Sequence, residues 1–309
     1  MSQRTIKIGT RGSRLALFQA EQLQEKILKV HPDAITEIVI IKTRGDVIMD
    51  VALSKIGDKG LFTKELERGL IVGEIDIAVH SLKDLPTELP DNFVVGAVLE
   101  RADFRDVLVS RHNKKLSELN AGDRIGTSSL RRQANLLHID KNLQVVDIRG
   151  NINTRLQKME DGYCDAIVMA AAGLVRLGLE KYITEILDPE VFIPAVSQGV
   201  IAAEIREDDA YLNQICEKLN HRRTWLACKM ERAFLNALQG GCQVPAGCYT
   251  IFNDSSVSIT GFVASPDGEI YIKEYLTGAV GEAEDIGRQL AGKLLARGGD
   301  LILKKIRDA

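Results

Sequence analysis

Aromatic residues are scarce in this chain, and several other features that would indicate particular functions are missing. Phe, Trp and Tyr make up 5% of the 309 residues, which argues against a nucleic-acid surface built on base stacking. No apolar run approaches the length of a membrane span, and the N-terminal residues lack the apolar core and cleavage site of a secretion leader. We therefore expect a cytoplasmic protein that binds neither membranes nor nucleic acid.

Cysteine and charge usage exclude further classes. The cysteines are odd in number and scattered, which argues against a disulfide framework, and none forms a Cys-X-X-Cys pair. Apart from His221, the histidines lie far from them in sequence, so we expect no metal site. The net charge is -3, so any anion site has to come from local clustering of arginine.

Strand and helix patterns alternate through the first half of the chain. Residues 5–10, 38–41 and 75–79 have the pattern of strands, and a helix is expected from about Ser13. This alternation predicts a mainly parallel sheet covered by helices.

Two short segments recur in the same order. Residues 8–10 (Ile-Gly-Thr) resemble residues 125–127, and residues 76–79 (Asp-Ile-Ala-Val) resemble residues 165–168. A repeat of this kind predicts two domains of similar topology, each with a strand–turn–helix mouth at a shared cleft.

The pattern changes from about Arg222. A helix over 222–238 is followed by a Gly-rich loop with Cys242, and strands near 257–259 and 270–272 flank a Ser-Pro-Asp-Gly turn. A last helix carries Ile286, Leu290 and Leu294 on one face. These elements predict a small α+β domain.

Several side chains could carry chemistry, and each has a plainer interpretation. The Gly-Thr-Ser mouth before Arg131 and Arg132 suits an anion at a helix start, or is an ordinary N-cap with solvated arginines. Asp84 could move protons or form a surface ion pair, whereas His80 favours a structural hydrogen bond. Cys242 could be an exposed nucleophile or an inert thiol.

Seven motifs in this order resemble the porphobilinogen deaminase (hydroxymethylbilane synthase) family. They span the chain: residues 11–16, 43–46, 59–62, 80–86, 126–132, 149–151 and 240–245. The resemblance implies a transferase of porphyrin, tetrapyrrole and haem biosynthesis. Such an enzyme deaminates and condenses four porphobilinogen molecules head to tail into hydroxymethylbilane.

The resemblance also implies the cofactor and the site. A dipyrromethane cofactor would be held covalently by a thioether to Cys242, and Asp84 would be the catalytic acid–base group. Residues matching the family's cofactor-binding set are Ser13, Lys83, Asp84, Ser129, Arg131, Arg132 and Arg155. Those matching the substrate-binding set are Arg11, Gln19, Thr127, Arg149, Arg176 and Gln198, and the active-site loop would include Lys55, Lys59 and Phe62.

The family's fold is α/β, with two similar domains of type II periplasmic-binding-protein topology and a small α+β C-terminal domain. It implies domain 1 over 1–99 and 198–219, domain 2 over 100–197, and domain 3 over 220–309 with a three-stranded sheet, helices and the cofactor-attachment loop. We expect a monomer that passes its product to uroporphyrinogen III synthase. Asp58 and Ser197 depart from the family pattern, and Asp58 could alter closure of the active-site loop.

Two other functions stay open from the residues alone. A non-catalytic two-domain binder of small anions would need no Gly-Gly-Cys loop. An acyl transferase with a cysteine nucleophile would need a base near Cys242, and no histidine lies close to it in sequence.

Overall fold

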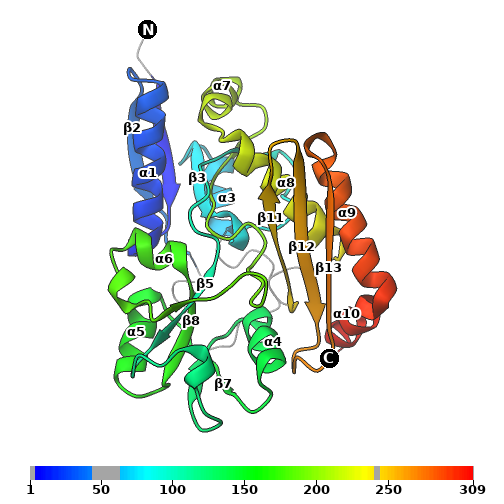
Figure 1. Ribbon diagram of the computed structural model, residues 1–309. Coiled ribbons are helices and arrows are strands. Elements are labelled where there is room, and N and C mark those ends of the chain that lie inside the picture. Colours follow the sequence, from blue (N-terminus) through cyan, green and yellow to red (C-terminus); the bar gives the residue numbers. More distant parts are fainter. Residues whose placement is uncertain (1–3, 44–62, 240–243, 309) are drawn as a thin grey trace. The chain divides into compact units, whose positions relative to one another are not determined.

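The computed structural model describes residues 4–43, 63–239 and 244–308 (Figure 1). The chain divides into two compact units, and each is made of two separate segments. Unit 1 comprises residues 1–102 and 199–225, and unit 2 comprises residues 103–198 and 226–309. The exact boundaries of a three-domain division stay a prediction.

Unit 1 contains a five-stranded sheet with the order β2-β1-β3-β10-β4. The strands are β1 (Thr5–Thr10), β2 (Ile35–Ile40), β3 (Ile77–Ser81), β4 (Phe93–Val98) and β10 (Ile201–Arg206). β1 runs parallel to β2 and β3, whereas β10 is antiparallel to both of its neighbours.

Helices cover both faces of this sheet. α1 (Arg14–Val30) and α7 (Ala210–Leu219) share one apolar core with the sheet, and α3 (Lys64–Ile71) packs on a second core. α1 buries Ala20, Leu23 and Ile27, which lie on one face at helical spacing. The helix predicted from about Ser13 is therefore confirmed.

Unit 2 contains a second five-stranded sheet with the order β7-β6-β8-β5-β9. Its strands are β5 (Asp106–Ser110), β6 (Arg124–Gly126), β7 (Gln144–Val146), β8 (Ala166–Ala170) and β9 (Glu185–Ile186). β6 is parallel to β7 and β8, and β5 is antiparallel to β8 and β9. The two sheets therefore share one topology, in which the antiparallel strand forms soon after the chain crosses from one unit to the other, at residue 103 for β5 and at residue 199 for β10.

Helices also cover both faces of the second sheet. α5 (Ile152–Glu160) and α6 (Ala171–Arg176) pack on one face, and α4 (Leu130–Ile139) packs on the other. The C-terminal residues of three parallel strands, β7, β6 and β8, lead into α5, α4 and α6. Binding sites of open α/β sheets form at such strand ends.

The internal repeat in the sequence corresponds to matching contacts in the two sheets. Asp76 precedes β3 and accepts a hydrogen bond from the backbone N–H of Lys7 at 2.9 Å. Asp165 precedes β8 and accepts the same bond from Arg124 at 2.8 Å. Each aspartate therefore joins two adjacent parallel strands of its own sheet, β1 with β3 and β6 with β8, as expected for two related domains.

A third, antiparallel sheet lies in the C-terminal part of unit 2. Its strands are β11 (Ala246–Phe252), β12 (Ser256–Ala264) and β13 (Tyr271–Ala279). The chain turns between β12 and β13 at Gly268, whose φ of +71° suits glycine. α8 (Arg222–Ala237), α9 (Ala283–Leu294) and α10 (Asp300–Arg307) are its helices, and α9 runs beside β12 and β13 (Figure 1).

These elements confirm the fold class predicted from the sequence. Two similar α/β domains of type II periplasmic-binding-protein topology are followed by a small α+β domain. The predicted apolar face of the last helix is also confirmed, because Ile286, Leu290 and Leu294 are all buried in the core of the third sheet.

Candidate functional site

Each of the two similar domains places a serine at the start of a helix that follows a parallel strand, β1 in unit 1 and β6 in unit 2. Ser13 caps α1 by accepting from the Ala16 N–H at 3.2 Å, and Ser129 caps α4 by accepting from the Arg132 N–H at 3.5 Å. The buried Thr127 hydroxyl oxygen accepts from the Ser129 N–H at 3.2 Å. Some backbone N–H groups at these helix starts, which could have bound an anion, thus donate to serine or threonine hydroxyls instead. An anion bound here would therefore depend more on side-chain donors.

The largest concentration of buried charge lies at the start of α4. Arg131 and Arg132 are 4% and 7% exposed, and both contact Asp106, which is fully buried at the start of β5. Arg131 Nη1 donates to Asp106 Oδ2 at 2.8 Å, and Arg132 Nε and Nη2 donate to Asp106 Oδ1 at 3.0 and 2.7 Å. The two arginines are therefore buried. The plainer interpretation, which required solvated arginines, is wrong.

This cluster carries two positive charges and one negative charge. Burial opposes ionisation of Asp106, but the charges of Arg131 and Arg132 outweigh it and hold the pKa of Asp106 at about 2. Burial lowers the pKa of Arg131. The buried Nε of Arg131 has no hydrogen-bond partner among the described residues. An excess positive charge and an unused donor suit an additional anion.

Gln198 belongs to the same cluster. Its Nε2 donates to the Phe104 carbonyl at 2.8 Å and to Asp106 Oδ1 at 3.2 Å. The preceding residue, Ser197, has a left-handed φ of +57°, and its N–H donates to Glu231 at 2.7 Å. The chain at Ser197 is therefore a constrained turn that orients Gln198.

Two further arginines lie beside the Gly-Thr-Ser mouth. The Ser128 hydroxyl donates to the Ile148 carbonyl at 2.6 Å, which brings the mouth next to the turn that contains Arg149. Arg155 donates through Nε to the Gly150 carbonyl of that turn at 2.8 Å. Arg149 Nη1 is buried without a hydrogen-bond partner among the described residues. Basic residues thus follow both of the neighbouring strands β6 and β7.

Arg176 adds a basic group after the neighbouring strand, β8. It is the last residue of α6, and burial lowers its pKa to about 10. β7, β6 and β8 are adjacent and parallel, and basic residues follow each of the three strands. This arrangement suits a ligand with several carboxylates.

Unit 1 places its predicted residues after β1 and β3, which are adjacent parallel strands. Buried Gln19 donates to the Ser81 hydroxyl at 2.8 Å and so ties α1 to the end of β3. Lys83 and Asp84 follow in a short 3-10 helix, where Asp84 is exposed. Arg11 and Ser13 follow β1 and are partly buried. The predicted residues of unit 1 therefore follow two adjacent parallel strands, and among them Asp84 presents an exposed carboxylate.

His80 has the structural role expected of it. The ring is buried, and its Nε2 lies 2.8 Å from Oε2 of the fully buried Glu204. His80 is on β3 and Glu204 is on β10, so the pair joins two neighbouring strands.

The sequence interpretation missed both Asp106 and Glu204. Each is an acidic residue within an apolar strand, and that placement was the only available signal. Their basic partners are distant in sequence, so no local motif identifies them.

Part of the predicted site lies outside the described residues: Cys242 and the loop residues Lys55, Asp58, Lys59 and Phe62. The strand after Cys242 is described, and it contacts Arg131. A Cβ atom at Gly247 would lie 2.9 Å from Arg131 Cδ and 2.3 Å from the Pro194 carbonyl oxygen. The chain therefore passes directly over Arg131 five residues after Cys242.

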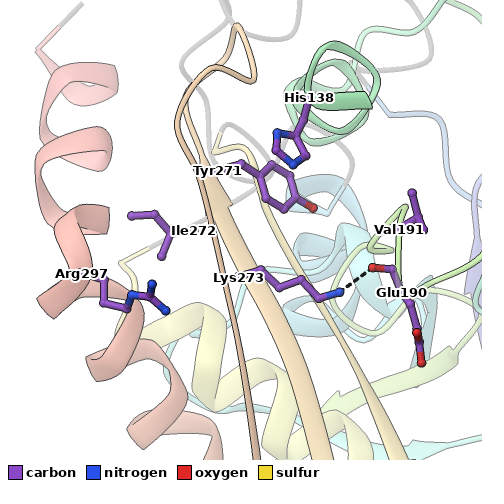
Figure 2. Close-up of a pocket in the computed structure, with 7 residues that line it drawn as sticks. All are labelled: His138, Glu190, Val191, Tyr271, Ile272, Lys273 and Arg297. Atoms are coloured by element: carbon purple, nitrogen blue, oxygen red, sulfur yellow. Dashed lines mark hydrogen bonds between the residues drawn. The ribbon is translucent and has the colours of Figure 1, made fainter. Parts of the chain in front are cut away.

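A pocket of about 500 Å³ lies elsewhere in unit 2 (Figure 2). Its lining residues are His138, Glu190, Val191, Tyr271, Ile272, Lys273 and Arg297. The His138 ring stacks on Tyr271 at 4.0 Å, and Lys273 Nζ donates to the Glu190 carbonyl at 2.6 Å. None of the predicted site residues lines this pocket.

The described ranges also bear on metal binding and on membrane spanning. Residues 4–43, 63–239 and 244–308 contain no group of three or more His, Cys, Asp or Glu side chains placed to hold a metal ion. In the same ranges, no helix is both long and apolar enough to cross a membrane.

Comparison with known proteins gives a family for this arrangement. Residues 6–214 match the family described as "Porphobilinogen deaminase, dipyromethane cofactor binding domain", and residues 225–296 match "Porphobilinogen deaminase, C-terminal domain". The chain belongs to the porphobilinogen deaminase family. The porphobilinogen deaminase of Pelotomaculum thermopropionicum is 49% identical over 306 residues, which are 99% of this chain and 98% of that protein. That of Syntrophomonas wolfei is 49% identical over 308 residues, 98% of this chain and 99% of that protein.

Among solved structures, a TRAP periplasmic solute binding protein from Desulfovibrio salexigens is similar with a TM-score of 0.44 and 13% identity. The similarity covers 72% of this chain and 74% of that protein.

Family membership confirms the predicted activity and cofactor class. The chain is a transferase that deaminates and condenses porphobilinogen into hydroxymethylbilane, and it uses a dipyrromethane cofactor. The anion binder and the acyl transferase are not favoured. The comparisons do not assign roles to individual residues, so these roles follow as proposals.

Proposed function

We propose that Cys242 is the covalent attachment point of the dipyrromethane cofactor and that Asp84 is the acid–base group of this porphobilinogen deaminase. The observation that carries the proposal is the contact between Gly247 and Arg131. Five residues span at most about 17 Å, so a group attached at residue 242 starts near the arginines of α4.

The described residues fit a group that carries carboxylates. Arg131 Nε and Arg149 Nη1 are buried without hydrogen-bond partners among the described residues. Such donors cost free energy unless a ligand accepts from them. In this proposal, Ser13, Lys83, Ser129, Arg131, Arg132 and Arg155 bind the cofactor, whereas Arg11, Gln19, Thr127, Arg149, Arg176 and Gln198 bind substrate and growing chain.

The bound dipyrromethane supplies the free pyrrole end to which each new ring is joined. Asp84 donates a proton to the departing amine of porphobilinogen, and its carboxylate then stabilises the positive charge left on the substrate. After the new carbon–carbon bond forms, Asp84 accepts the proton released from the pyrrole. The arginines neutralise the acetate and propionate groups, which fixes the ring positions before the bond forms.

The remaining expectations are part of the same proposal. Lys55, Lys59 and Phe62 belong to an active-site loop, and domain 1 comprises 1–99 and 198–219, domain 2 comprises 100–197 and domain 3 comprises 220–309. The enzyme works as a cytoplasmic monomer and passes its product to uroporphyrinogen III synthase. The buried free thiols of Cys164 and Cys216 support a reducing compartment.

An Asp84→Asn variant tests the role of Asp84. We expect a fold like that of the wild type and a loss of turnover of at least about 100-fold, because the amide cannot transfer protons. The matched control is Asp91→Asn, an exposed aspartate farther along the same segment, which should keep full turnover. Turnover retained by Asp84→Asn would remove Asp84 from the mechanism.

A further inference from the structure

Asp106 divides its two oxygens between the two arginines of α4. Oδ2 accepts from Arg131 Nη1, whereas Oδ1 accepts from Nε and Nη2 of Arg132 and from Gln198. Nε and Nη2 of Arg132, the side-on pair of donors on one edge of its guanidinium, therefore both donate to Asp106.

Arg131 is held differently. Its Nη1 donates to Asp106 and also to the Ile193 carbonyl at 2.7 Å. Both bonds engage the nitrogen on the Cδ side of the guanidinium. They do not use the side-on pair, Nε and Nη2, whose geometry matches the two oxygens of a carboxylate.

The surrounding contacts make this orientation rigid. Asn135 donates to the Arg131 carbonyl at 2.8 Å and accepts from the Tyr271 hydroxyl at 2.9 Å. The side chain of Arg131 also packs against Gly247. The Arg131 side chain is thus held by Asp106 of β5, by the Ile193 carbonyl and by the packing of Gly247 of β11.

We infer that Asp106 is a positioning residue that keeps the Nε and Nη2 pair of Arg131 available for one carboxylate of the dipyrromethane cofactor. The inference rests on the proposed function and assigns a role to a residue that does not touch the cofactor. Asp106 leaves the cluster with a single excess positive charge, which one carboxylate neutralises.

A purely structural role for Asp106 makes a different prediction. If the carboxylate only balanced the buried charges, any carboxylate at this position would suffice, and its removal would affect folding alone. If it positions Arg131, then a small displacement slows cofactor assembly in protein that is fully folded. The rate of cofactor loading separates the two roles.

The test uses cofactor-free protein prepared from cells that cannot make porphobilinogen. Porphobilinogen is added, and the gain in intact mass is followed with time at a temperature well below each variant's Tm. Asp106→Glu keeps the charge but lengthens the side chain by one methylene group. We expect it to load roughly tenfold to a hundredfold more slowly than wild type. Asp106→Asn removes the charge and should be slowed at least as much.

The control is Asp103→Glu, which makes the same change three residues away, where the aspartate forms an ion pair with Arg105. It should load at the wild-type rate. Wild-type loading by folded Asp106→Glu or Asp106→Asn would overturn the inference, as would equal slowing of the Asp103 variant. Failure of the wild-type protein to gain mass would instead contradict the proposed function.

Discussion

Gly247 lies where the strand after the cysteine loop crosses Arg131, and Gly247→Ala perturbs this contact directly. The added Cβ would lie 2.3 Å from the Pro194 carbonyl oxygen, 2.9 Å from Arg131 Cδ and 3.1 Å from Phe262. The Arg131 side chain can move slightly, but the backbone oxygen of Pro194 cannot, so β11 has to shift away from the backbone at Pro194. Overpacking of this kind costs about 1–3 kcal/mol. For a unit of this size, that is a decrease of roughly 2–12 °C in Tm.

The assay combines thermal unfolding with the rate of cofactor loading. We expect Gly247→Ala to lower both, because the shift moves the loop that carries Cys242 relative to Arg131. The control is Gly122→Ala, since a Cβ at Gly122 would have no neighbour within 4 Å. A Gly247→Ala protein with the Tm and loading rate of the control would refute the close contact between β11 and Arg131.

Two further predictions concern buried charges. Burial lowers the pKa of Arg176 to about 10, so Arg176 is charged below that pH and its affinity for carboxylates falls as the pH rises through about 10. The KM for porphobilinogen should therefore rise from pH 9 to pH 11 in the wild type. A similar rise in Arg176→Gln would contradict the assignment of Arg176 to substrate binding. His80→Ala leaves the fully buried Glu204 without its partner and should lower the free energy of unfolding by about 3–5 kcal/mol in urea titrations. The exposed control His112→Ala should change it little, and equal stability of the two variants would show that the pair is unimportant.

Local sequence patterns predicted much of the fold. β1, α1, the β12–β13 turn and the apolar face of α9 all follow from periodicity and turn chemistry within a few residues. The repeated Asp-led strands predicted two related domains, and the contacts of Asp76 and Asp165 show the physical basis of that repeat.

The pairings that depend on distant segments could not be read in this way. β10 pairs with β3 across more than 100 residues, and the buried Asp106 meets arginines about 25 residues away. The apolar neighbours of Asp106 predict a strand but give no partner for its charge. The sequence therefore indicated which arginines belong to the site, while the structure showed which of their nitrogens donate to Asp106.

The covalent attachment of the cofactor is the central claim, and intact-mass measurement of the purified protein tests it most directly. After incubation with porphobilinogen, the wild-type protein should carry the extra mass of two condensed pyrrole units. Cys242→Ser should lack this mass, and Cys248→Ser, which changes a buried cysteine on β11, should retain it. A wild-type protein of unmodified mass, or a Cys242→Ser protein that still gains it, would contradict the account.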